Sequence, residues 1–179
     1  MSFSNPASQA KENAAAYVQA LMDLLGTRDP LEVQAQQLEL LEAEIADLAD
    51  AALRQPEKSG KWSILQVLQH LADSELVTSM RLRMILAYDT PDIQGYDQDA
   101  WAAKLNYSEC SLTDTLEQLR VLRRVNLKLL HSLNESQMNR VGIHSERGPE
   151  SVRRISQLVA GHDLLHLNQI RRIKKAIGV

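Results

Sequence analysis

The feature that most constrains the fold is a stripe of apolar residues in the last part of the chain. At about 100° per residue, one side of a helix over residues 151–177 collects apolar side chains and only a few polar ones. The apolar members are Ile155, Leu158, Val159, Ile170, Ile173 and Ile177, and the polar members are His162, His166 and Gln169. The pattern predicts a long helix that begins at a cap on Ser151 and packs against other helices. Asp163 and Leu164 fall largely outside this stripe.

The two histidines of the stripe are four residues apart, so both imidazoles leave one side of the helix about one turn apart. A buried polar group without a partner costs roughly 1–3 kcal/mol, so these imidazoles need hydrogen bonds, a metal ion or an internal cavity. One metal ion would serve both, but it needs at least one more ligand from another segment. The residues alone leave a metal site and a pair of packed core histidines equally open.

The composition is that of one helical domain. The chain has 179 residues, and 44% of them are hydrophobic, which is sufficient for a sizeable core. Many Leu, Ala, Gln and Glu residues, with only seven Gly and five Pro, favour an all-α fold. A net charge of −3 indicates neither nucleic acid nor an anionic membrane as a partner. No apolar run of about 18 residues and no export signal is apparent, so we expect a cytoplasmic protein.

The chain divides into five predicted helices. We expect frayed residues at 1–8 and helices over about 9–25, 30–53, 63–88, 111–133 and 151–177. Gly26 stops the first helix, and Asp29 with Pro30 starts the second. The segments between 89 and 110 and between 134 and 150 have no clean period. The prediction is a four-helix bundle over residues 30–179, with residues 1–29 as an N-terminal helical extension packed on it.

The third predicted helix supplies a third imidazole. Val67, Val77 and Ile85 lie within about 60° of His70 on a helical wheel, so His70 also points along an apolar side. Facing helices of a bundle can bring such a histidine to the His162 and His166 pair. Asp73 lies about 60° from His70, where its carboxylate could orient an imidazole or a bound water.

Four further residues have open roles. Tyr96 and Trp101 belong to the irregular 89–110 segment, where aromatic side chains predict either a pocket wall or simple packing. Asp97 lies between them without an assigned role. His144 lies in the irregular 134–150 segment and is left out of the ligand set, and His131 ends a helix, where a cation is favoured for structural reasons.

Three sequence blocks, taken together, resemble the DinB-like family, which includes YfiT-type metal-dependent hydrolases and thiol transferases. The blocks are KWSI at 61–64 leading into QHLADSE at 69–75, YDQDAW at 96–101, and GHDLLHLNQI at 161–170. A His-x-x-x-His pair alone is weak evidence, whereas three blocks in the right order over residues 30–177 are specific. The resemblance implies an up-and-down bundle whose first helix runs antiparallel to the second across a short loop, with long crossovers elsewhere. It also implies a metal held by His70, His162 and His166.

Three neutral nitrogens would leave an open position on the metal, as in catalytic rather than structural sites. The resemblance then implies an enzyme acting on a small molecule, with zinc or nickel as the divalent metal. The reaction would be hydrolysis of a small amide or ester, or transfer of a low-molecular-weight thiol such as bacillithiol or mycothiol to an electrophile. A non-catalytic metal-binding stress-response protein and a structural helical module are the alternatives. The resemblance and the apolar Leu164 and Leu167 outside the main stripe also suggest a homodimer.

Overall fold

Four long helices form the bundle, and a side chain caps each of them at its start. The structure is a computed structural model that describes residues 10–179, with side chains from Ala14 onward, so the expected fraying of residues 1–8 lies outside the described residues. The bundle helices are α2 (Pro30–Ile45), α4 (Ile64–Ala87), α6 (Leu112–His131) and α8 (Val152–Ile177). Their caps are, in the same order, Asp29, Ser63, Ser111 and Ser151. The caps expected at Asp29 and Ser151 are therefore confirmed.

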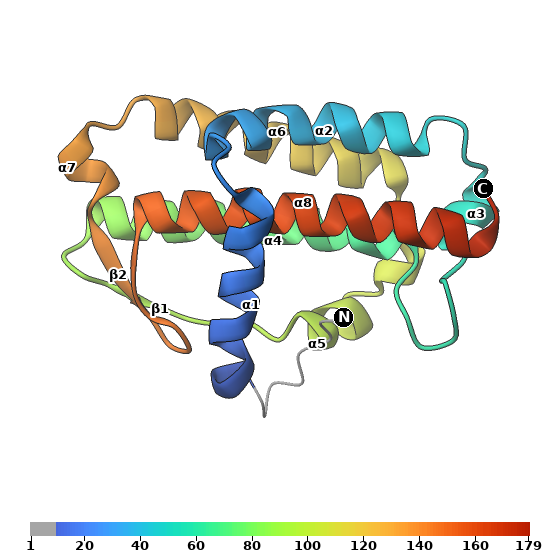
Figure 1. Ribbon diagram of the computed structural model, residues 1–179, viewed down its shortest axis with the longest axis horizontal. Coiled ribbons are helices and arrows are strands. Elements are labelled where there is room, and N and C mark those ends of the chain that lie inside the picture. The colour runs from blue at the N-terminus through green and yellow to red at the C-terminus, as the bar shows by residue number, and fades with distance from the viewer. Residues whose placement is uncertain (1–9) are drawn as a thin grey trace.

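The bundle helices do not simply alternate in direction. In Figure 1, α2 and α8 run one way along the long axis, and α4 and α6 run the other way. Helix α2 packs on α8, and α4 packs on α6, so the two best-packed pairs are parallel. Helix α2 is antiparallel to α4, as the resemblance implied, but the connection between them contains a short helix of its own. Parallel neighbours need long connections, which accounts for the extended segment between α4 and α6.

Helix α1 (Ala10–Leu25) crosses the outer side of α8 at a steep angle (Figure 1). The two backbones meet at Gly161, where an added Cβ would lie 2.3 Å from the carbonyl oxygen of Leu21. Only glycine permits an approach this close, so the helix interior accepts the propensity cost of Gly161. The division of the chain at residues 29 and 30 stays a prediction.

The helix expected over residues 30–53 is broken in two. Helix α2 ends at Ile45, and a separate short helix, α3 (Asp50–Arg54), follows after a turn. No Gly or Pro lies in this turn, so the sequence gives no signal for the break. The break lets the buried Leu53 pack with Leu41 and Leu65 in the same apolar cluster, and this tertiary contact overrides helix propensity.

A small sheet lies at one end of the bundle, in segments that were expected to be irregular. Its strands are β1 (Asp92–Ile93), β2 (Val141–His144) and β3 (Gly148–Ser151). They lie in the order β1-β2-β3, with β1 parallel and β3 antiparallel to β2. The same connections hold the short helices α5 (Gln98–Lys104), η2 (Tyr107–Glu109) and α7 (Glu135–Met138). The sheet ties the two long crossovers together, and the all-α class is otherwise confirmed.

The core consists of two apolar clusters with a buried polar layer between them. One cluster gathers the start of α4 and the end of α8, and the other gathers the end of α4 and the start of α8. Between the clusters, the middle turns of both helices carry buried polar and charged side chains. These side chains are His70, Asp73, Glu75, Asp163 and His166, together with Arg123 from α6. Buried polar groups need partners, so this layer is where the functional site is sought.

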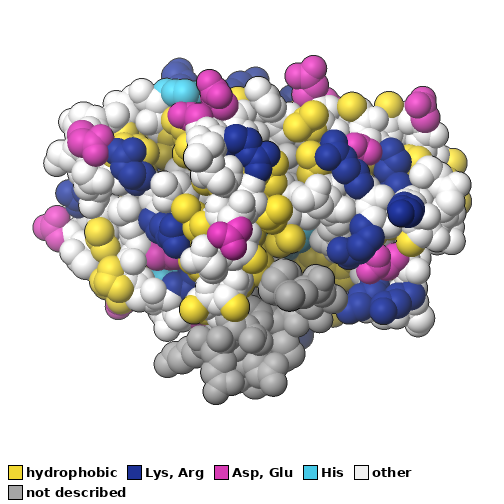
Figure 2. All heavy atoms as spheres, in the orientation of Figure 1, with side chains coloured by type: hydrophobic (Ala, Val, Ile, Leu, Met, Phe, Trp, Pro, Cys, Tyr) yellow, Lys and Arg dark blue, Asp and Glu magenta, His cyan; other side chains and the backbone are white. Residues whose placement is uncertain are grey.

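The surface that carries α1 and α8 mixes both signs of charge. Figure 2 shows basic side chains gathered toward the C-terminal end of α8, with acidic ones among them. Ion pairs join Arg171 and Lys174 to Glu44, and Arg172 to Glu57. Within residues 10–179, no helix is long and apolar enough to cross a membrane.

Candidate metal centre

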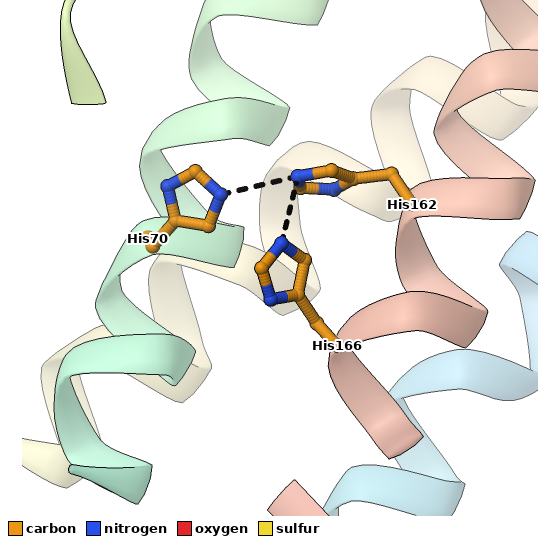
Figure 3. A group of neighbouring side chains, drawn as sticks. All are labelled: His70, His162 and His166. Atoms are coloured by element: carbon orange, nitrogen blue, oxygen red, sulfur yellow. Dashed lines mark hydrogen bonds between the residues drawn. The ribbon is translucent and has the colours of Figure 1, made fainter. Parts of the chain in front are cut away.

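Three imidazoles meet between α4 and α8, in the middle of the bundle. His70 comes from α4, and His162 and His166 come from successive turns of α8, with their rings turned toward one point (Figure 3). The Nε2 atom of His162 is 3.1 Å from Nε2 of His70 and 3.0 Å from Nε2 of His166. Nitrogens bound to one tetrahedral metal at 2.0–2.1 Å lie about 3.3 Å apart. Two of the separations are therefore close to what one ion requires, and the ligand atoms of all three histidines lie within 4.8 Å of one another.

Burial keeps these imidazoles neutral. It lowers the pKa of His70 and His162 well below the usual value, and the mutual proximity of the rings lowers both further. Burial also lowers the pKa of His166, to about 4, although its contact with Gln169 acts in the opposite direction. Metal ligation requires the neutral ring, so no proton has to be removed from the folded protein near neutral pH.

The outer ring nitrogens are held in two different ways. Nδ1 of His166 donates to Oε1 of Gln169 at 2.7 Å, which leaves the lone pair of Nε2 facing the other two rings. Nδ1 of His70 is buried and has no hydrogen-bond partner among residues 10–179. The His70 ring instead packs against Trp62, with ring centroids 5.1 Å apart. Gln169 and Trp62, both within the motifs noted above, therefore orient two of the three imidazoles.

The segment after α4 folds over the site. The hydroxyl of Ser74 lies 3.5 Å from Nε2 of His70 and 2.8 Å from the hydroxyl of Tyr96. The Tyr96 ring packs against Trp101 at a centroid distance of 4.7 Å. Asp97 accepts a hydrogen bond from the backbone N–H of Ala100 and caps α5. Tyr96 thus forms part of a pocket wall, whereas Trp101 packs against Tyr96 and lines neither described cavity, so each of the two readings left open holds for one of these residues.

Two cavities adjoin the histidine cluster, and Tyr17 and Gln98 line both of them. The first, of about 260 Å³, is lined by His162, Ser74, Tyr96 and also Tyr17 of α1. The second, of about 430 Å³, is lined by His166, Trp62, Gln169 and Arg172. Helix α1, predicted as an extension, therefore forms part of the site. The mid-helix glycine beside His162 is the sequence signal that could have pointed to this contact.

Asp73 is buried beside the site, but its hydrogen bonds lead away from it. The carboxylate accepts from the Tyr107 hydroxyl at 2.6 Å, from Nε2 of Gln118 at 3.0 Å and from Nε2 of Gln69 at 3.3 Å. In the described part of the chain, no hydrogen bond joins Asp73 to the three histidines. The role expected for Asp73 next to the metal stays a prediction.

A charged network lies behind the histidines, and sequence reasoning missed it. Arg123 of α6 donates to both carboxylate oxygens of Asp163, at 2.6 and 3.0 Å, and to Glu75 at 3.0 Å. Asn126 donates to the other oxygen of Glu75 at 2.8 Å. Burial opposes the charge on Arg123, but the two carboxylates outweigh it and raise the pKa. The expectation that Asp163 lies off the buried stripe was wrong, because α2 and α6 cover that side of α8 as well.

The other two described histidines lie apart from the cluster. His131 is the exposed last residue of α6. His144 is buried on β2 and lines the first cavity, away from the three converging nitrogens. Neither completes the ligand set, in agreement with its exclusion at the level of sequence.

Comparison with known proteins gives both a family and a fold. The profile of the DinB superfamily matches residues 34–170. A "Putative metal-dependent hydrolase" of Oceanobacillus iheyensis is 30% identical over 136 residues, which cover 76% of this chain and 78% of the relative. The similarly named YfiT of Bacillus subtilis is 26% identical over 132 residues, 73% of this chain and 74% of that protein. The solved structure of YfiT, described as a probable metal-dependent hydrolase with an unusual four-helix bundle topology, superposes with a TM-score of 0.75 at 23% identity, covering 97% of this chain and 93% of YfiT.

Proposed function

The chain belongs to the DinB superfamily, and we propose that it is a metal-dependent enzyme acting on a small molecule, with His70, His162 and His166 as the metal ligands. The observation that carries the proposal is the convergence of three neutral Nε2 atoms at the edge of a cavity. Without a metal, the Nε2 atoms of the three rings would face one another in the core, and each close contact between two of them could share at most one proton. An ion would satisfy all three at once.

The donor set also limits the metal and its chemistry. Imidazole nitrogens suit zinc and nickel alike, so either divalent ion fits. A metal held by three protein nitrogens supplies Lewis-acid activation of a water molecule or a thiol at its open position. Gln169 would keep His166 in the tautomer that presents Nε2 inward.

The hydroxyls of Ser74 and Tyr96 are the protein's own groups at the reacting end of the cavity. Burial raises the pKa of Tyr96, so its hydroxyl stays protonated near neutral pH. With Ser74 as its partner at 2.8 Å, Tyr96 can donate a hydrogen bond to a substrate oxygen that gains charge in the reaction. The Tyr96 ring, packed at a tilt against Trp101, covers this end of the cavity and would limit the access of water.

Hydrolysis of a small amide or ester is the reaction we favour, in line with the names of the relatives. Transfer of a low-molecular-weight thiol to an electrophile is the second candidate, and one observation favours it. Two cavities adjoin the same histidines, one at His162 and the other at His166, which suits a reaction with two substrates. Hydrolysis requires only one of them and water.

The test begins with metal analysis of protein purified without added metal. We expect about one ion per chain, and a protein without bound metal would overturn the proposal. The metal-loaded protein is then assayed with amides, esters and thiol plus chlorinated or epoxide substrates, with and without chelator. Activity that the chelator removes and His166→Ala lacks would identify the reaction.

A homodimer and a cytoplasmic location are the remaining proposals. Leu167 is buried inside the chain's own core, so it cannot serve a dimer interface as expected. Apolar side chains do remain exposed on α4 and α6, namely Leu76, Met80, Val121 and Val125. A second copy would cover them. Sedimentation of wild type beside Met80→Glu tests the dimer, and a wild-type monomer at high concentration would exclude it.

A further inference from the structure

The first cavity contains a partly buried cation, Arg81, that makes no ion pair within the described residues. Arg81 lines the cavity from α4 and donates through Nη2 to the carbonyl of Gln94 at 2.7 Å. Its Nε–H is buried with no acceptor, and no carboxylate of residues 10–179 lies within ion-pair distance. A buried N–H without an acceptor costs free energy, so the missing partner has to be explained.

A second unpaired donor lines the same cavity. Nδ1 of the buried His144 accepts a hydrogen bond from the backbone N–H of Glu146 at 3.1 Å. The neutral ring must then carry its proton on Nε2, and this atom is buried without a partner in the described chain. Burial and then the nearby Arg147 and Arg81 lower the pKa of His144 to about 4. His144 is therefore a neutral N–H donor near neutral pH.

The fold brings these two donors together at the sheet end of the bundle. Ile93 of β1 pairs with His144 of β2, and Arg81 donates to the carbonyl of Gln94, the next residue of the β1 segment. Both side chains therefore flank the same two-residue strand and face the same cavity.

The other cations of the cavity wall are already satisfied. Arg147 makes a two-point ion pair with Glu150 at 2.7 and 2.8 Å. Arg123 is saturated by Glu75 and Asp163. Among the described side chains that line this cavity, Arg81 is thus the guanidinium left for a ligand. The carboxylate of Glu146 also lines the cavity, but neither Nε–H of Arg81 nor Nε2–H of His144 donates to an acceptor in the described chain. A negatively charged ligand oxygen would satisfy both donors.

We propose that Arg81 and His144 bind an anionic oxygen group of the substrate, while the reacting bond lies at the three histidines. The proposal rests on the proposed function and names the substrate class: a small molecule with a carboxylate or similar oxyanion set several bonds from the reacting centre. His70, Ser74, Thr78 and Arg81 follow one another on one face of α4, and Ser74, Thr78 and Arg81 line the cavity. Eleven residues of helix separate His70 from Arg81, which is about 16 Å between their Cα atoms.

The experiment measures binding of simple anions to the full-length protein. Titration calorimetry with glutarate, inorganic phosphate and neutral glutaramide should give saturable binding for an anion and none for the amide. The anion that binds tells a carboxylate site from a phosphate site. Arg81→Gln and His144→Phe should each weaken binding by about 10- to 100-fold, because each removes one hydrogen bond to a charged group. Arg83→Gln is the matched control, since Arg83 on the same helix is occupied by Ser79 and Asn126 and lines neither cavity.

Two further readouts guard against a folding artefact. Arg81→Lys keeps the positive charge and should lose less affinity than Arg81→Gln at an unchanged circular dichroism spectrum. In protein labelled with ¹⁵N-histidine, the Nε2–H signal of His144 should move downfield when the anion binds. The proposal is overturned if neither anion binds, or if wild type and Arg81→Gln bind equally well and the His144 signal does not move.

His166→Ala separates this inference from the proposed function. Anion binding that survives in His166→Ala supports the Arg81 and His144 site, whatever the metal content of the wild type. Anion binding that disappears in His166→Ala would place the anion on the metal and overturn this inference, while the proposal that the wild type binds a metal would stand.

Discussion

His162 and Asp163 are neighbours on α8, yet they lead into two opposite kinds of buried polar site. Asp163 points toward α6, where Arg123, Glu75 and Asn126 satisfy one another completely. His162 points toward α4, where the Nε2 atoms of three histidines converge and no other group of the described chain donates a hydrogen bond to satisfy all of them. On the Asp163 side of the helix every charged group has its hydrogen-bond partners, whereas the nitrogens on the His162 side still need a ligand.

The difference separates structural from functional polarity. A fully paired ion network has no free group with which to bind a ligand, and breaking it leaves buried charges unpaired. An open set of neutral lone pairs costs stability until a ligand satisfies it, and this makes it a binding site. Variants on the Arg123 side should therefore affect folding, and variants on the His162 side should affect binding.

The largest effect is expected from Arg123→Met. Loss of the guanidinium leaves Glu75 and Asp163 buried without a counter-ion, which should lower the free energy of unfolding by about 3–5 kcal/mol. Urea unfolding of metal-free protein measures the change. Arg120→Met is the matched control on the same helix, because its ion pair with Glu42 is exposed and worth about 1 kcal/mol or less. Equal losses in the two variants would refute the distinction.

Next come the ligand variants His70→Ala, His162→Ala and His166→Ala. Each removes one of three metal-binding nitrogens, so metal affinity should fall by more than the roughly 100-fold that an outer partner gives. Metal analysis by mass spectrometry, with circular dichroism for the fold, measures this. His131→Ala should keep a full equivalent of metal. If His162→Ala keeps it too, the histidines are core residues rather than ligands.

Gln169→Ala should have a smaller effect on the same site. The amide orients His166 through a 2.7 Å hydrogen bond, and loss of such an outer partner typically weakens metal binding about 10- to 100-fold. Competition with a chromogenic chelator gives the affinity. Asn168→Ala, at the exposed neighbouring position, should bind metal like wild type. Unchanged affinity in Gln169→Ala would mean that His166 is held by packing alone.

Asp73→Asn tests a residue that lies between the two kinds of site. The change puts an amide in place of a carboxylate that accepts from Tyr107 and Gln118, so we expect a loss of about 1–2 kcal/mol in unfolding free energy. Metal affinity measured on the same sample decides the role predicted from sequence. A concurrent drop of about 10-fold or more would assign Asp73 to the metal site, and unchanged affinity would remove it.

The smallest expected effect is on metal content when the pH is lowered from 7 to 6. Because the pKa of His166 in the folded protein is about 4, and burial also lowers those of His70 and His162, protons should compete with metal mainly as the pH approaches 5 to 4. This window lies below the one the reference pKa of about 6.5 suggests. Metal lost already between pH 7 and 6 would contradict the buried, neutral cluster.

Stability of the metal-free protein should follow a different pH window. The unfolded chain takes up protons on these histidines below about pH 6.5, whereas the folded chain does so only near their lowered pKa values. Their contribution is therefore complete above about pH 6.5 and is lost as the pH falls toward 4. In His131→Ala the same curve should appear, because His131 is exposed.

Several features followed from the sequence alone because their causes are local. The caps at Asp29 and Ser151 depend on side chains bonding to backbone N–H groups two or three residues away. The pairing of His162 with His166 depends only on helical periodicity, and the apolar wheel around His70 turned the third ring inward. The three-block resemblance identified the family and the fold.

Other features were decided only by tertiary structure, because contacts between distant segments create them. The break after Ile45 allows Leu53 to pack in the core. Strand β1 pairs with a strand about fifty residues later in the chain, and β1 is too short to show a period in the sequence. The need for glycine at position 161 becomes clear only from the close contact of the α1 backbone with α8. Arg123 and Arg81 are alike in sequence, each an arginine on an amphipathic helix. Only the neighbours that the fold brings to each decide that Arg123 is paired inside the bundle and that Arg81 faces a cavity with its Nε–H unpaired among the described residues.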